Sequence, residues 1–179
     1  TMSLELSRRS FMKLSALTAV AVAGSSLLGG CSDSSETLYP SGAFGKKLKL
    51  MGEFTVSDPA YDASTNTLTC NFKAKCTSST PLSIRKKFFQ IEVLRNKTTT
   101  VYNDETSGCE LSLGQSNYYL EKNSELNTVL TLTGITLQEG DVLSVMYFPR
   151  LESSSNGNGQ AYTDLHATWK GTYKNGAFA

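Results

Sequence analysis

Histidine is nearly absent from this sequence, and its scarcity excludes the commonest kinds of catalytic centre. A Ser–His–Asp hydrolase needs a histidine between a carboxylate and a nucleophile on a sharp turn, and the chain has no GxSxG elbow. The one histidine, His166, falls on the polar side of an alternating segment, so we expect it to face water. Glycine-rich phosphate loops and dinucleotide fingerprints are lacking as well. We therefore predict a protein that is not an enzyme and that holds no cofactor.

An excess of charge of either sign is also lacking. The chain has 17 Lys and Arg against 16 Asp and Glu, and a formal net charge of +1. Nucleic-acid binding requires a concentrated basic face, so we predict no nucleic-acid partner. Asp104-Glu105 lies in a polar loop, and Glu139 and Asp141 flank a turn glycine. We expect these carboxylates to be solvated turn residues rather than the facing pair of a glycosidase.

Cysteine is scarce and is not spaced for a metal. No CxxC pair occurs and no histidine lies near the cysteines, so we predict no metal site. Cys70 and Cys76 share one predicted strand, where six residues at about 3.3 Å each separate their Cα atoms by roughly 20 Å, too far for a disulfide. Cys109 has the same parity as Leu111 and Leu113 and is expected to face inward. A bridge from Cys109 to Cys70 or to Cys76 is allowed, and three reduced, buried thiols are the equal alternative.

Long apolar runs are missing too. Residues 14–28 are interrupted by Ser, Thr and Gly, whereas a membrane-spanning helix needs about 20 mainly apolar residues. The stretch is typical of the central region of a signal peptide. A paired arginine, followed by an aromatic residue and a lysine, precedes it and resembles the twin-arginine export signal. The residues of this pattern are Arg8, Arg9, Phe11 and Lys13.

The end of the apolar stretch, Leu28-Gly29-Gly30-Cys31, resembles a bacterial lipobox. The resemblance implies that a diacylglyceryl group is attached to the Cys31 sulfur and that the chain is cleaved before this residue. Two or three acyl chains, at about 0.8 kcal/mol per buried methylene, make a stable anchor. We therefore expect residues 1–30 to be a signal peptide. The mature chain is then an extracytoplasmic lipoprotein of the bacterial cell envelope, held on the membrane by its lipid.

Two regions follow the signal peptide. Residues 31–47 are polar and rich in small residues, and we interpret them as the lipidated cysteine and a flexible tether. Residues 48–179 are the predicted domain, and their number is enough for one hydrophobic core but not for two. Residues 142–148 are apolar on both parities, as in a central strand. The clearest alternating segments are 48–56, 68–76, 126–132 and 165–173.

Turn signals such as Asp58-Pro59 separate these segments. Short strands at this spacing favour an all-β, antiparallel β-sandwich of about seven to nine strands. Residues 83–94 fit either a helical stripe or a strand, and the β-rich context favours the strand.

The order of the segments resembles the immunoglobulin-like ectodomains of bacterial lipoproteins, some of which are described as telokin-like. The resemblance is carried by a polar turn at 77–80, the strand pattern of 89–96 and the later segment 137–143. It implies an immunoglobulin-like fold over most of residues 48–173, and no catalytic residue is implied. The chain departs from antibody domains because it has no Cys–Trp–Cys arrangement, and Trp169 lies in the last predicted strand.

Binding is therefore the predicted role. We expect an unknown protein partner, as in adhesion or envelope assembly, and a carbohydrate- or small-ligand-binding module is the alternative. The polar loop 152–160 is a candidate contact segment. Tyr118 and Tyr119 must point to opposite faces of their strand, and the exposed one, with Tyr102 or Tyr61, is a candidate stacking surface for sugar rings.

Overall fold

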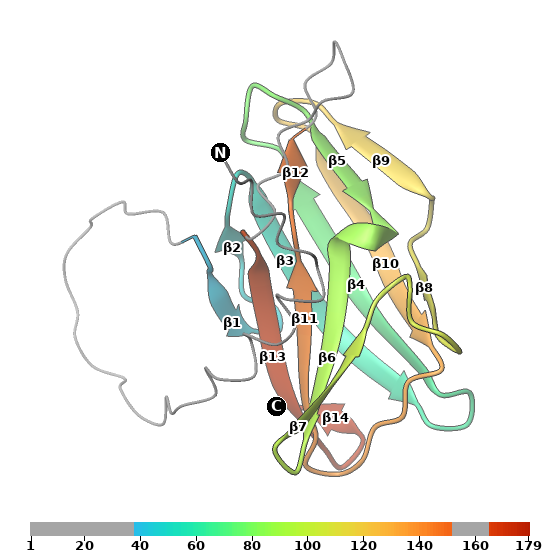
Figure 1. The fold of residues 1–179 in the computed structure, drawn as a ribbon. Helices are drawn as coiled ribbons and strands as arrows, with labels where there is room; N and C mark the ends of the chain where they lie inside the picture. The colour runs from blue at the N-terminus through green and yellow to red at the C-terminus, as the bar shows by residue number, and fades with distance from the viewer. Residues whose placement is uncertain (1–37, 152–164) are drawn as a thin grey trace, which may run out of the picture. The chain divides into compact units, whose positions relative to one another are not determined.

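The computed structural model describes residues 38–151 and 165–179, which belong to one compact unit (Figure 1). The export pattern, Cys31 and the loop 152–160 lie outside the described residues. The described chain is almost entirely β, with one 3-10 turn, η2 (Lys86–Phe88), and it contains no helix long and apolar enough to cross a membrane. The strands are β1 (Ser41–Ala43), β2 (Leu48–Lys49), β3 (Glu53–Asp62), β4 (Thr67–Lys75), β5 (Leu82–Arg85), β6 (Phe89–Arg95), β7 (Thr98–Tyr102), β8 (Glu110–Ser112), β9 (Asn117–Leu120), β10 (Glu125–Thr133), β11 (Val142–Tyr147), β12 (Arg150–Leu151), β13 (Ala167–Lys174) and β14 (Ala177–Phe178).

Two large sheets and one small sheet make up this unit. The six-stranded sheet has the order β1-β13-β11-β6-β7, with β14 paired to β13, and the five-stranded sheet has the order β2-β3-β4-β10-β8 (Figure 1). A three-stranded sheet, β12-β5-β9, completes the described fold. Among the described strands, only β1 and β13 pair in parallel. The predicted all-β sandwich is confirmed, although the structure describes fourteen strands where about seven to nine were expected.

The two large sheets enclose an aromatic core. Phe54 of β3 and Phe72 of β4 contact Phe89 of β6 and Tyr147 of β11, with ring centroids 4.9 Å apart for Phe54–Tyr147 and for Phe72–Phe89. All four side chains are at most 1% exposed. They point inward because side chains alternate between the two faces of a strand. The predicted central strand is confirmed as β11, which lies between β13 and β6.

Residues 41–47 belong to the domain, which differs from the predicted tether that ended at Lys47. β1 adds to the edge of β13, and the Thr168 N–H donates to the Pro40 carbonyl at 3.0 Å. The indole N–H of buried Trp169 donates to the Lys46 carbonyl at 2.8 Å. A strand of three residues is too short to show alternation, so no local pattern indicates this pairing.

Three segments differ locally from the predicted pattern. The alternating segment 48–56 is split into β2 and β3 by a turn in which Met51 has a φ of 55°. Asp58-Pro59 does not end a strand but lies in a bulge of β3, where the register with β4 shifts and Asp58 has a φ of 50°. Residues 83–94 are neither one helix nor one strand, because η2 joins β5 to β6.

The three described cysteines are free, which matches the second of the two alternatives left open above, except that Cys109 is half-buried rather than buried. Cys70 is paired with Leu130 on β10, whereas Cys109 precedes β8, on the far side of β10. Two strand spacings amount to roughly 9.5 Å, beyond the Cα separation of about 4.4–6.8 Å that a disulfide needs. The Cys109 thiol instead lies 3.5 Å from the Gly134 carbonyl, and burial raises the pKa of Cys70 to about 12.

Candidate binding surface

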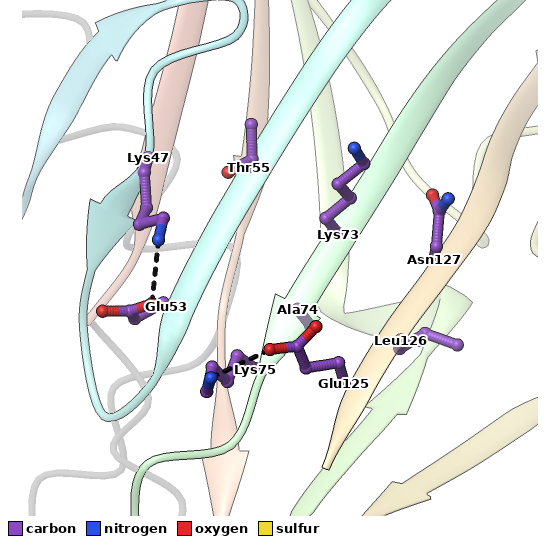
Figure 2. A pocket seen from close by; sticks show the side chains of 9 residues that line it. All are labelled: Lys47, Glu53, Thr55, Lys73, Ala74, Lys75, Glu125, Leu126 and Asn127. Atoms are coloured by element: carbon purple, nitrogen blue, oxygen red, sulfur yellow. Dashed lines mark hydrogen bonds and ion pairs between the residues drawn. The ribbon is translucent and has the colours of Figure 1, made fainter. Parts of the chain in front are cut away.

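A groove of about 410 Å³ lies on the outer face of the five-stranded sheet, and we call it the charged groove (Figure 2). Strands β3, β4 and β10 form most of its floor. Because alternation sends the apolar residues of these strands to the core, their polar residues face outward into the groove. The lining residues are Lys47, Glu53, Thr55, Lys73, Ala74, Lys75, Glu125, Leu126 and Asn127.

A row of alternating charges crosses the groove at one end. The strand register places Glu53, Lys75 and Glu125 side by side on β3, β4 and β10. Lys75 Nζ lies 2.9 Å from Glu125 Oε1, and Lys47 Nζ lies 3.1 Å from Glu53 Oε2 (Figure 2). The hydrogen bond from Lys47 lowers the pKa of Glu53, and the bond from Lys75 lowers the pKa of Glu125. These four charges are therefore satisfied by one another.

The next row across the same strands holds a cation that forms no ion pair with a described residue, although its charge contributes to lowering the pKa of nearby Asp58. The register aligns Thr55, Lys73 and Asn127, and Figure 2 shows the Lys73 side chain between the other two. Lys73 is exposed, and no described residue forms an ion pair or hydrogen bond with it. Its flanking hydroxyl and amide groups are neutral and can each donate a hydrogen bond. This row can accept a carboxylate, sulfate or phosphate group together with a neighbouring hydroxyl.

A second hollow, of about 290 Å³, lies beside the hairpin formed by β6 and β7. Arg95 lines it and also binds Asp141, with Nε 2.9 Å from Oδ1 and Nη2 2.6 Å from Oδ2. Asp141 is only 2% exposed, so the prediction that it is a solvated turn residue is wrong. The hydrogen bond from Arg95 lowers the pKa of Asp141, although burial of the carboxylate opposes this effect. The pair holds the 134–141 connection against β6 and is structural.

The structure does not bring the candidate tyrosines together. Tyr102 belongs to β7 of the six-stranded sheet, whereas Tyr118 and Tyr119 belong to β9 of the three-stranded sheet. Tyr119 is 48% exposed, and the Tyr118 hydroxyl is held 3.0 Å from Thr128 Oγ1. Tyr61 packs edge-on against Tyr173. The exposed Tyr119 therefore lies on a different sheet from Tyr102 and from Tyr61 of β3, and the described structure does not place it beside either ring as the predicted platform requires.

His166 differs from the sequence-based expectation as well. The ring is half-buried rather than turned to water, and its centroid lies 5.1 Å from both Tyr39 and Phe148. Tyr39 comes from the segment before β1, which lies in the predicted tether.

In the part of the chain that the structure describes, no group of three or more His, Cys, Asp or Glu side chains is placed to hold a metal ion.

Sequence reasoning did not single out the charged groove. Each of its strands was predicted, and the outward parity of Lys73 and Thr55 follows from the same alternation. What the sequence lacks is the register between strands, which aligns Lys73 with Thr55 and Asn127 rather than with a glutamate, as it does for Lys75. The only signal was an excess of lysine on the polar parity of 68–76.

Taken together, the fold and the groove define an all-β sandwich with a polar surface site on one sheet. No model of a known protein family matches the sequence, and no characterised protein matches it by sequence. Solved structures with a similar fold include the yjhA protein of Bacillus subtilis, at 16% identity, a TM-score of 0.48, and coverage of 73% of this chain and 98% of that one.

Two further structures are less similar. The ycdA protein of Bacillus subtilis, a proposed lipoprotein, has 15% identity and a TM-score of 0.40, and the match covers 67% of this chain and 36% of ycdA. The archaellum periplasmic stator protein FlaG of Sulfolobus acidocaldarius has 11% identity and a TM-score of 0.37, with coverage of 66% and 98%. These similarities are too low to support a statement about activity or partner.

Proposed function

We propose that this chain is a non-enzymatic lipoprotein of the bacterial cell envelope, whose β-sandwich binds another protein through the charged groove. The observation that carries the proposal is Lys73, an exposed cation in a row of neutral hydrogen-bonding groups. Charges elsewhere in the groove are paired within the chain, so they need no partner to satisfy them. Among the groove residues, Lys73 would therefore contribute most to the binding free energy by pairing with an acidic side chain on a partner.

Placement at the membrane rests on the export pattern and on Cys31. Mass spectrometry of the native protein is expected to find a diacylglyceryl group on Cys31 and no residues before it. Replacing the paired arginines, Arg8→Lys with Arg9→Lys, is expected to leave the uncleaved chain in the cytosol. An unmodified Cys31, or residues 14–28 still attached to the mature chain, would overturn this placement.

The binding role is tested by capture from envelope extracts. The Lys73→Glu variant reverses the charge in the middle of the row Thr55, Lys73 and Asn127, and we expect it to lose the partner that the wild-type chain captures. Lys170→Glu is the matched control, because Lys170 is an exposed lysine on β13 of the other large sheet. Equal capture by both variants would show that the groove is not the binding surface.

A second candidate function is the binding of an acidic carbohydrate. The row of Thr55, Lys73 and Asn127 favours it, since these groups suit a sugar that carries a carboxylate or sulfate beside its hydroxyls. A glycan array that includes uronic-acid and sulfated sugars separates the two functions. Binding on the array that Lys73→Glu abolishes and Lys170→Glu retains would favour the carbohydrate, and silence on the array with a folded chain would remove it.

A further inference from the structure

We infer that β7 is a pairing edge for a second copy of this chain, through which two copies join their six-stranded sheets across a two-fold axis. β7 lies at the end of its sheet, with β6 on one side and no described strand on the other (Figure 1). An edge strand exposes a row of unpaired backbone groups, and proteins usually protect such rows with charges, proline, bulges or short length.

β7 has none of these protections. Its sequence, TTTVY, contains no charge and no proline, and consists of residues that favour strands. Its register with β6 runs without interruption from Arg95–Thr98 to Ile91–Tyr102. It is also longer than the other edge strands of the described sheets, since β1 and β8 have three residues and β2 has two.

The hairpin geometry determines which backbone groups are available. Asn96 and Lys97 have φ values of 48° and 68°, as the two central residues of a type I′ turn. The flanking pair, Arg95 and Thr98, is then a hydrogen-bonded pair, and the pattern alternates along the strand. The N–H and C=O groups of Thr99 and Val101 therefore point away from β6 and are free to bond to another strand.

The charges at the two ends of β7 favour a second copy in the antiparallel direction. Lys97 precedes the strand and Asp104 follows it, and both are exposed. An antiparallel copy brings Lys97 of each chain to the end of β7 where Asp104 of the other chain lies. A parallel copy would bring the two lysines together. The antiparallel arrangement also limits the assembly to a dimer, because a two-fold interface uses the same surface of both chains and leaves no β7 edge free.

The test is sedimentation equilibrium of residues 35–179, the compact unit that contains the whole described core. Val101→Lys places two ammonium groups close to the two-fold axis, and Thr99→Pro removes an outward donor without touching the bonds to β6. We expect each variant to raise the dimer dissociation constant at least about tenfold. Val129→Lys is the matched control, because Val129 is 46% exposed on β10 of the other sheet, and it should leave the constant unchanged.

Hydrogen exchange gives a readout specific to this edge. Protection of the Val101 amide should rise with protein concentration, whereas that of Thr100, which is bonded to β6, should not change. A wild-type chain that stays monomeric up to about 1 mM would overturn the inference. Equal weakening by Val101→Lys and Val129→Lys would do the same, as would a monomer whose β7 edge binds only an extended peptide from another protein. Circular dichroism and thermal melts confirm that each variant is folded.

Discussion

Replacing Tyr147 by phenylalanine should stabilise the domain. The side chain is fully buried between Phe54, Phe72 and Phe89, with ring centroids 4.8–5.0 Å away. Its hydroxyl has no hydrogen-bond partner among the described residues. Burial without a partner raises the pKa of Tyr147 and costs about 1–3 kcal/mol relative to water. Tyr147→Phe keeps the ring contacts and removes this cost.

We expect the variant to gain about 1 kcal/mol in the free energy of unfolding, which corresponds to a rise of roughly 2–4 °C in Tm. Urea unfolding should show a higher midpoint at an unchanged slope. Tyr118→Phe is the matched control, because its hydroxyl is bonded to Thr128, and it should lose about 1 kcal/mol. If Tyr147→Phe loses stability as Tyr118→Phe does, the Tyr147 hydroxyl has a partner and the reasoning is refuted.

Two further predictions concern the contacts that hold connections to the sheets. Asp141→Asn should cost about 2 kcal/mol, less than a fully buried pair because the Arg95 side chain is 34% exposed. Since the pKa of Asp141 is lowered by folding, the stability from the pair is fully present above the unfolded-state pKa of about 3.9 and is lost as pH falls from there through the lower folded-state pKa. The difference between wild type and Asp141→Asn in urea unfolding should therefore vanish in acid, and a difference that persists would contradict the ion pair. Trp169→Phe should cost about 2 kcal/mol and speed amide exchange at Thr168, which bonds to Pro40, whereas unchanged exchange would show that the indole bond to Lys46 does not hold β1.

The alternation of apolar and polar residues predicted the long strands, because burial of one face of a strand is visible in the local sequence. Along β4, Leu68, Cys70 and Phe72 are buried while Thr69 and Asn71 are not, and a run of this kind has one reading. The same local reasoning was wrong at Asp58-Pro59. Asp-Pro is a turn signal, but here it forms a bulge inside β3, whose position is set by the pairing with β4.

The features that the sequence did not predict depend on residues far apart in the chain. Asp141 was interpreted as solvated because it follows a turn glycine, and its partner Arg95 lies 46 residues earlier. β1 has no alternating pattern of its own and is a strand because it pairs with β13. The charged groove likewise follows from the register of three strands. In each case the conformation is stabilised by a residue or strand that is distant in the sequence, so the local sequence alone does not predict it.

The two proposed binding surfaces would recognise their partners by physically different means. On the charged groove, specificity would come from side chains, and Lys73 would attract an acidic partner less strongly as salt is raised. At β7, affinity would come from backbone groups and uncharged side chains, which salt screens little. The edge strands of the five-stranded sheet differ from β7 because they carry charges, Lys49 on β2 and Glu110 on β8. Charges on an edge strand discourage pairing with another strand. Because the groove and β7 belong to different sheets, we expect a loss of partner binding at the groove to leave the proposed pairing through β7 unchanged.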